Sequence, residues 1–158
     1  MSSDNFTRMI LLADEFFKTK NDPSQLSIDE RVMERLHTIH PATMGALSDE
    51  NGPIAWTIII PTTNAVMERF LKKNIGEREL LELSEHTQQF ESIYLCSAVV
   101  LPEQRGKGFA KQLLNDSVRS IMADHSIRTF YYCAFSMEGD ALARTVSKSF
   151  TLPLRKRE

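Results

Sequence analysis

The stretch ESIYLCSAVVLPEQRGKGFAKQLL, residues 91–114, decides the fold. Residues 91–100 are apolar on both alternating faces, which predicts a strand covered on both sides. We expect Ile93, Leu95 and Val99 to face one way, and Tyr94, Cys96, Ala98 and Val100 the other. From about residue 107 to 123, apolar residues recur at helical spacing and predict an amphipathic helix. A buried strand therefore passes through a proline and two glycines directly into a helix.

Patterns on either side of this stretch predict the remaining elements. Helical spacing recurs in several segments, over 4–19, 28–39, 63–83 (interrupted near Gly76) and 138–147. Two extended runs flank Asn51-Gly52 and predict a β-hairpin. A strand is expected at 127–135 and an extended piece at 149–154, with the basic end LRKRE in solvent. This order predicts a single α/β domain over residues 1–158, a mixed sheet with helices on both faces.

Composition narrows the classes of function. The chain has 158 residues, 42% of them hydrophobic, and a formal net charge of −2, which argues against a general nucleic-acid or membrane-surface binder. No apolar run approaches the roughly 20 residues of a membrane span. Acids within the apolar N-terminal stretch predict a helix there and not a signal peptide. Cys96 and Cys133 lie in apolar runs without metal spacing, so we expect buried, reduced thiols, no bound metal and a cytoplasmic location.

Residues 102–111 invite comparison with three kinds of glycine loop. A phosphate-binding P-loop needs Lys and Ser or Thr after its last glycine, but Gly108 is followed by Phe109. A dinucleotide fingerprint beginning at Gly106 needs glycine at 111, where the chain has Lys111. A simpler anion cradle remains, since a helix start offers unpaired N–H groups and glycines let an anion approach them. The alternative left open is a plain glycine turn with solvated basic residues.

The pattern Arg105-x-x-Gly108-x-Ala110 resembles the R/Q-x-x-G-x-G/A motif of the GNAT superfamily, the acetyl-coenzyme A-dependent N-acetyltransferases. The resemblance is sharp over about 91–114, and the order of elements follows the family over about 25–154. It implies a mixed, mostly antiparallel sheet flanked by helices, and acetyl-coenzyme A as the co-substrate. It also implies that the strand at 91–100 splays from the strand at 127–135, with the thioester arm of the cofactor in the gap.

The resemblance assigns the cofactor to two sets of residues. The diphosphate would be held by the loop and the helix start, at Arg105, Gly106, Lys107, Gly108, Phe109, Ala110 and Lys111. The pantetheine would be held by backbone groups of the strand, at Ala98, Val99 and Val100. Three cations in this segment contrast with a slightly acidic chain, as a polyanionic ligand requires.

The chain departs from the family where catalytic residues are expected. The place of the usual carboxylate base is taken by Tyr94, with Glu91 on the other strand face, and the place of the usual acid tyrosine is taken by Thr145. Tyr94 and Tyr132 are the candidate catalytic residues, and water relays are the alternative. A helical insertion at about 62–90 and a short last strand are further departures. A second copy of the chain, as a homodimer, would cover that sheet edge.

The residues leave two other functions open beside acetyl transfer to a primary amine. One is an acyl-coenzyme A-binding module without catalysis. The other is a protein-interaction module that uses the 62–90 insertion, with Phe70 and Leu71 at its contact face. For the enzyme, small-molecule amines, amino acids, peptide N-termini and lysine side chains all remain as acceptors, because acceptor sites are built from loops without a fixed motif.

Overall fold

The computed structural model describes residues 2–17, 30–133 and 137–157, with backbone alone at 2–4 and 13–17. Its elements are α1 (Ser2–Phe17), α2 (Glu30–Ile39), β1 (Met44–Asp49), β2 (Gly52–Thr62), α3 (Asn64–Leu71), α4 (Glu77–Ser84), β3 (Ser92–Val100), a 3-10 turn η1 (Pro102–Gln104), α5 (Phe109–Asp124), β4 (Thr129–Cys133), α6 (Met137–Phe150) and β5 (Leu154–Arg157). The predicted order is confirmed. Positions 18, 19, 28, 29, 134 and 135 of the predicted elements lie outside the described residues.

The five strands form one mixed sheet in the order β1-β2-β3-β4-β5. β2 pairs antiparallel with β1 and β3, whereas β4 pairs parallel with β3 and β5. The parallel pairs follow from the crossovers through α5 and α6, which return the chain in the same direction. A mostly antiparallel sheet was predicted. The antiparallel ladders are the longer ones, but the two kinds of pairing are equal in number.

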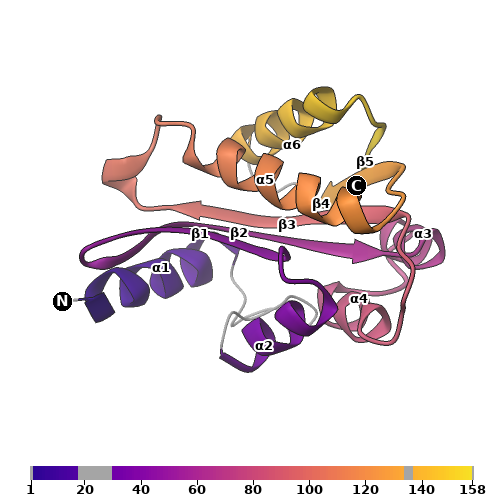
Figure 1. Ribbon diagram of the computed structural model, residues 1–158, viewed down its shortest axis with the longest axis horizontal. Coiled ribbons are helices and arrows are strands. Elements are labelled where there is room, and N and C mark those ends of the chain that lie inside the picture. The colour runs from indigo at the N-terminus through magenta and orange to yellow at the C-terminus, as the bar shows by residue number, and fades with distance from the viewer. Residues whose placement is uncertain (1, 18–29, 134–136, 158) are drawn as a thin grey trace.

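Helices cover both faces of the sheet (Figure 1). α5 and α6 lie on one face, and α1, α2 and α4 lie on the other, with α3 at the end near β5. Buried side chains under α5 and α6 include Ile59, Ile93, Leu114, Val118 and Phe130. Those on the opposite face include Ile58, Ile60, Phe70, Tyr94 and Tyr131. The α/β class is therefore confirmed, and among the described residues no helix has the length and apolar character needed to cross a bilayer.

Gly45 in β1 permits a close approach between α5 and the sheet. A Cβ atom at this position would lie 2.6 Å from Thr57 Oγ1 and 3.3 Å from Leu113 Cβ and Ser117 Oγ. The contact below 3.0 Å is with Thr57 of β2, and at 3.3 Å Leu113 and Ser117 of α5 would each have to give by a few tenths of an ångström. The missing side chain thus fixes how near the helix lies to the sheet.

The predicted hairpin and the helical insertion are both present. Asp49 Oδ1 accepts a hydrogen bond of 2.8 Å from the Asn51 N–H in the turn between β1 and β2. The insertion consists of α3 and α4, separated near Gly76 as predicted. Phe70, expected at a contact face, is fully buried against Tyr94 and the sheet. The alternative that places Phe70 at a contact face is therefore wrong, because the apolar stripe of the insertion packs into the core.

Two further expectations are corrected by strand geometry. The ladder between β2 and β3 shifts where Ile58 faces Ser97 and Ile59 faces Leu95, so Cys96 is an extra residue in β3. This bulge reverses the alternation, and Val99 packs against Met9 of α1 and not on the side of Ile93 and Leu95.

The second correction concerns the end of the chain. The segment 149–154 was expected to be extended, but α6 continues to Phe150 and the strand is Leu154–Arg157. The basic residues thought to be solvated are thus an edge strand, held by a pairing of Arg155 with Glu68 and by Lys156, whose Nζ lies 3.6 Å from Asp140. Opposite charges on α3 and α6 favour this strand over a free tail.

Candidate functional site

β3 and β4 pair over only part of their length. The parallel register joins Ser92 with Thr129 and continues to Leu95 with Tyr132. Beyond Leu95, within the described part of the chain, β3 pairs with β2 alone, as far as Val100. The bulge at Cys96 marks the point where the strands part. The second half of β3 thus keeps one edge that β4 does not use.

Hydrogen-bond alternation shows which backbone groups face that edge. The Leu101 N–H donates to the Ile54 carbonyl at 3.0 Å, so this residue faces β2. In an antiparallel pair the direction alternates, and the polar groups of Val100 and Ala98 therefore face away from β2. The Val100 carbonyl accepts from Arg105 Nε at 3.1 Å. Of the three residues predicted to hold a ligand through backbone groups, Ala98 and Val100 have those groups on the edge away from β2, whereas those of Val99 face β2 and are not available to a ligand.

The loop after β3 has two glycines in a left-handed conformation. Gly106 has φ of 81° and Gly108 has φ of 80°, a region that favours glycine. A Cβ at either position would meet nothing within 4 Å, so the surroundings are open. The first backbone bond into α5 runs from the Gln112 N–H to the Gly108 carbonyl at 3.0 Å. Among the described residues, the amides from Gly106 to Lys111 have no such acceptor.

The charged side chains of the loop are exposed, as an anion site requires. Arg105 is directed back to β3 by its bond to the Val100 carbonyl, and Lys107 Nζ donates to Gln104 Oε1 at 2.8 Å. Lys111 is exposed in the first turn of α5. These three cations belong to the same short segment as the unused amides of the helix start. The arrangement suits a diphosphate, because the helix dipole and the side chains attract the same charge.

Phe109 and Ala110 begin the helix and are half-buried. The Phe109 ring packs against the cluster that contains Trp56, Val99 and Leu101. Phe109, which the sequence predicts beside a cofactor, thus makes a structural contact with the core. This packing fixes the start of α5 relative to the end of β3.

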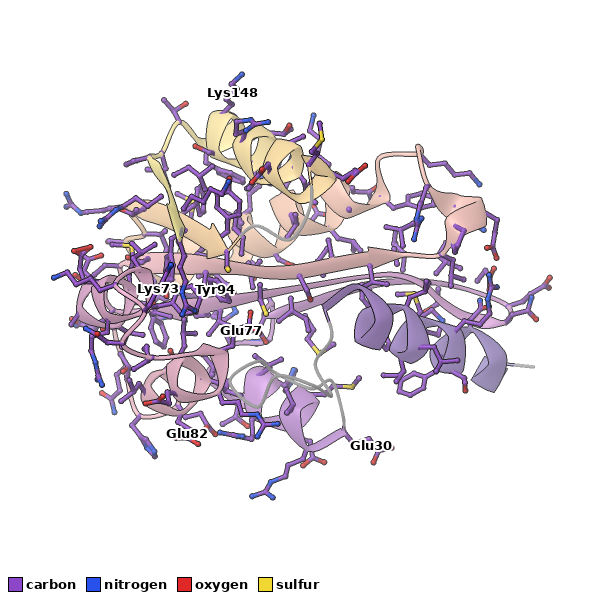
Figure 2. The ribbon with its side chains drawn as sticks, turned by 180° about the vertical axis from the view of Figure 1, so that it is seen from behind. Glu30, Lys73, Glu77, Glu82, Tyr94 and Lys148 are labelled. Atoms are coloured by element: carbon purple, nitrogen blue, oxygen red, sulfur yellow. The ribbon has the colours of Figure 1, made fainter. Side chains whose placement is uncertain are left out.

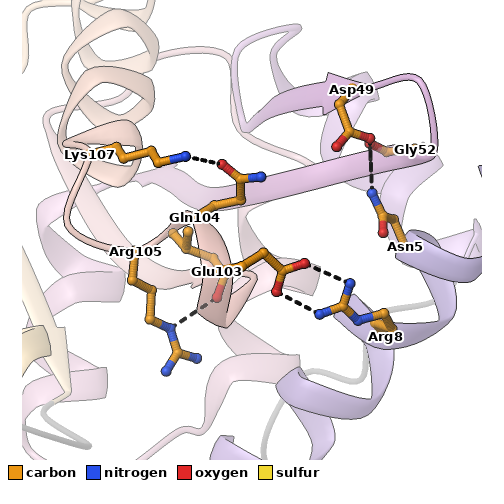
Figure 3. A network of polar contacts seen from close by, with 9 residues as sticks. Asn5, Arg8, Asp49, Gly52, Glu103, Gln104, Arg105 and Lys107 are labelled. Carbon is orange, nitrogen blue, oxygen red and sulfur yellow. Dashed lines mark hydrogen bonds and ion pairs between the residues drawn. The ribbon is translucent and has the colours of Figure 1, made fainter.

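A polar latch joins α1 to the turn that precedes the loop (Figure 3). Arg8 donates two hydrogen bonds to Glu103, at 2.8 and 2.7 Å. This arginine lowers the pKa of the Glu103 carboxyl to about 2. On the same helix, Asn5 Nδ2 donates to Asp49 Oδ1 at 3.1 Å, at the tip of the hairpin. The turn η1 is thus attached to the N-terminal helix on one side and continues into the glycine loop on the other.

A buried carboxylate lies where β3 and β4 part. Glu77, the first residue of α4, is 8% exposed and accepts a hydrogen bond of 2.5 Å from the Tyr94 hydroxyl. The Cys96 thiol at the bulge donates to the same oxygen, Oε2, at 3.6 Å. Burial raises the pKa of Tyr94 well above its ordinary value, and the negative charge of Glu77 adds to the rise. Tyr94 is therefore a hydrogen-bond donor near neutral pH and not a base.

Tyr132, the second candidate catalytic residue, lies on the opposite face of the sheet. Its neighbours Phe130 and Tyr131 pack into the two different clusters, and its own hydroxyl donates to Asp140 of α6 at 2.7 Å. This bond lowers the pKa of Asp140. The structure therefore does not bring Tyr94 and Tyr132 together, and only Tyr94 adjoins the carboxylate at the bulge.

Glu77 was missed by the sequence reasoning, although a signal exists. The inward positions of α4 are Glu77, Leu80, Leu81 and Ser84, which are spaced as one face of a helix. An acid at an inward position is unusual, because an unpaired buried charge is costly. Phenol and thiol donors on β3 offset that cost here, and the sequence alone does not show them.

A search for metal ligands and two comparisons with known proteins complete the description of the site. Within the ranges that the structure describes, no three histidine, cysteine or acidic side chains gather as metal ligands would. No protein-family model matches the chain, and no curated protein matches it either.

Proposed function

We propose that this protein is an acetyl-coenzyme A-dependent N-acetyltransferase of the GNAT kind, acting on a primary amine by direct transfer. The observation that carries the proposal is the juxtaposition of three features on one strand. β3 is free of β4 beyond Leu95, it continues into a loop of left-handed glycines with unused amides, and it has a buried carboxylate at its bulge. A plain glycine turn would need neither the free edge of β3 nor the buried carboxylate at the bulge.

The loop and the free strand edge suit different parts of the cofactor. The open amides from Gly106 to Lys111 would bind the diphosphate, with Arg105 and Lys107 as neighbouring cations. The outward backbone groups of Ala98 and Val100 would pair with the amides of the pantetheine arm, as a neighbouring strand would. Both sets belong to one continuous segment, so they are held in a fixed relation.

Glu77 supplies the base that the family's usual position lacks. Acetyl transfer joins the amine nitrogen to the acetyl carbon and breaks the carbon–sulfur bond of the thioester. The amine loses a proton, which Glu77 would accept, and the departing thiolate is protonated from water. Tyr94 holds the carboxylate in position through its 2.5 Å hydrogen bond. In this proposal Glu77 comes from the helical insertion, which explains why the tyrosine at the family position is tolerated.

The test of the proposal is stabilisation by coenzyme A together with turnover. A ligand at 100 times its Kd stabilises the folded state by about 2.7 kcal/mol, which a thermal-shift titration detects. We expect this shift with coenzyme A, and release of free thiol from acetyl-coenzyme A with at least one amine in a panel.

A matched pair of variants at Gly108 makes this test specific for the loop. Gly108→Asn tolerates a positive φ and is expected to retain the shift, whereas Gly108→Val does not tolerate it and is expected to lose it. Absence of any shift with coenzyme A at millimolar concentration would end the proposal. A shift without turnover of any amine would leave only a binding module.

A further inference from the structure

Two cations near the parting of β3 and β4 have no acidic partner within the described residues. β5 contains three consecutive basic residues, of which Arg155 pairs with Glu68 and Lys156 with Asp140. Arg157, the third, places its guanidinium 4.4 Å from the ring centroid of Phe70. Lys73, just after α3, is exposed and has a left-handed φ of 66°.

Arg157 and Glu77 are connected through two aromatic rings. The guanidinium of Arg157 lies over the ring of Phe70, and the ring centroids of Phe70 and Tyr94 are 4.7 Å apart. The Tyr94 hydroxyl then reaches the Glu77 carboxylate at 2.5 Å. Figure 2 shows Lys73, Tyr94 and Glu77 in one region on the α3 and α4 side, with Lys148 on the far side of the sheet. A cationic group and a buried anionic group therefore lie within two ring contacts of each other.

The thiol of Cys133 lies near the same charged groups. Cys133 is the β4 residue in register with Arg157 of β5. Burial raises the pKa of Cys133, Arg157 and Lys73 lower it, and Glu77 raises it. Charges of both signs therefore act on one half-buried side chain at the end of β4, where the strand leaves β3.

Such a pair of opposite charges is complementary to a molecule that has both an ammonium and an anionic group. We propose, on the basis of the proposed function, that the acceptor is a small amine with a carboxylate, the amino-acid class, with its nitrogen at Glu77 and its carboxylate at Arg157 and Lys73. An arginine bound on one face by an aromatic ring still offers its N–H edge to a carboxylate.

The diphosphate of the cofactor does not account for these cations. The glycine loop follows the far end of β3, beyond Val100, whereas the pairing of β3 with β4 ends at Leu95. An extended strand rises about 3.3 Å per residue, so the two places are separated by the length of the free half of β3. The cations at β5 and α3 are thus available to a second ligand.

The experiment compares amines that differ only in their anionic group. Glycine, β-alanine and 4-aminobutyrate would be assayed against their amides and against the corresponding alkylamines, with acetyl-coenzyme A as donor. We expect kcat/KM to be at least about tenfold higher for the best carboxylate, because a charge-assisted bond contributes that much. In Arg157→Gln and Lys73→Asn the kcat/KM advantage of the carboxylate over its amide should shrink, mainly through KM. Asn suits the positive φ at Lys73.

Two controls keep the outcome interpretable. Lys148→Gln removes the same charge from α6, and it should leave the advantage intact. Arg157→Lys retains the positive charge but removes the guanidinium from the Phe70 ring, so it separates the effect of charge from the effect of packing. The inference is overturned if amides and alkylamines react as well as carboxylates, or if the variants leave the ratio unchanged.

A binding measurement separates this inference from the proposed function. Calorimetric titration of the amino acids in the presence of coenzyme A should show binding that Arg157→Gln weakens. If coenzyme A does not bind, the proposed function fails, whatever the acceptor. If coenzyme A binds and neither turnover nor binding depends on the carboxylate, the acceptor inference alone fails.

Discussion

Glu77 is a carboxylate that the fold removes from water and surrounds with hydrogen-bond donors. It is 8% exposed, and both Tyr94 and Cys96 donate to the same oxygen. Its position at the first turn of α4 adds the favourable field of the helix N-terminus. A charge held in this way can accept a proton at a defined atom, which is the property that the proposed reaction requires.

The residue-scale prediction concerns Glu77→Gln. The amide still accepts from Tyr94, so the fold should be retained, but it cannot take a proton. We expect kcat to fall by about 100-fold or more near neutral pH, because a positioned base contributes that much. The loss should shrink as the pH approaches the pKa of the amine, since a neutral amine needs no base. Steady-state rates between pH 6.5 and about 10 check this.

Glu79→Gln is the matched control for this prediction, because Glu79 is an exposed acid in the same helix. Its rate should equal that of the unaltered protein. Equal rates in Glu77→Gln and Glu79→Gln would contradict the role of Glu77, and thermal melting of both would show that the fold is intact.

At this scale the sequence predicts backbone roles better than side-chain roles. Gly108 could be assigned from spacing, because a left-handed residue before a helix has a local cause. The partnership of Glu77 with Tyr94 joins residues from a helix and a strand, and it depends on how the insertion packs. The spacing of α4 indicates that Glu77 faces inward, but not what it meets.

β3 is the element on which the proposed site depends, because it is paired on both edges at its start and on one edge beyond Leu95. The extra residue at Cys96 separates these halves. The turn η1 and the glycine loop then continue the strand to α5. Their position relative to β3 is set by Phe109 on one side and by the Arg8–Glu103 pair on the other.

The element-scale prediction concerns this latch. Arg8→Gln should weaken coenzyme A binding by about two- to fivefold, the usual scale for an exposed ion pair. It frees the turn, and it also leaves the Glu103 carboxylate unneutralised near the diphosphate site. Glu103→Gln should have a smaller effect, because it frees the turn but removes that negative charge. Titrations at two salt concentrations check this, with the difference largest at low salt.

Arg119→Gln is the control for charge alone, since Arg119 is an exposed arginine paired with Asp116 farther along α5. The double variant Arg8→Gln with Glu103→Gln should bind like Glu103→Gln. Additive losses would show that the two side chains act separately and would contradict a latch.

The order and type of elements could be predicted because hydrophobic period and turn residues act locally. The bulge at Cys96 could not, since it depends on the register with Ile58 and Ile59 in β2. The last strand was misplaced for a related reason. Its residues are basic and lack strand spacing, and they are held by charges on α3 and α6.

The whole molecule collects its buried acids of high pKa on one face of the sheet. Burial raises the pKa of Tyr94, Tyr131, Cys96 and Cys133, and nearby Glu77 adds to the rise for each of them except Tyr131. All four therefore favour the protonated form in the folded protein. This face is also the one covered by the insertion, so its packing and its titration are linked.

The molecule-scale prediction is a loss of stability in alkali. The folded pKa values lie above the unfolded ones, so the folded state binds more protons and its free energy of unfolding falls as pH rises. The stabilisation is intact below about pH 8.5, where an unfolded thiol starts to ionise, and decreases further through about pH 10, where an unfolded phenol does. Urea midpoints between pH 7.5 and about 10.5 measure the decline.

Cys96→Ala removes one of these groups and should make the decline shallower, by at most about 1.4 kcal/mol per pH unit. A midpoint that stays constant up to about pH 10.5 would contradict the prediction. If the free energy of unfolding of Cys96→Ala falls with pH as steeply as that of the unaltered protein, Cys96 does not contribute to the decline.

The missing side chain of Gly45 affects a part of the chain that it does not touch. Because α5 approaches β1 closely at this residue, a Cβ would push Leu113 and Ser117 outward by a few tenths of an ångström and, with them, the helix that starts after Gly108. β3 would stay in place, since it is bonded to β2. In the proposed binding mode, Gly45 therefore helps to set the distance between the glycine loop and the free edge of β3.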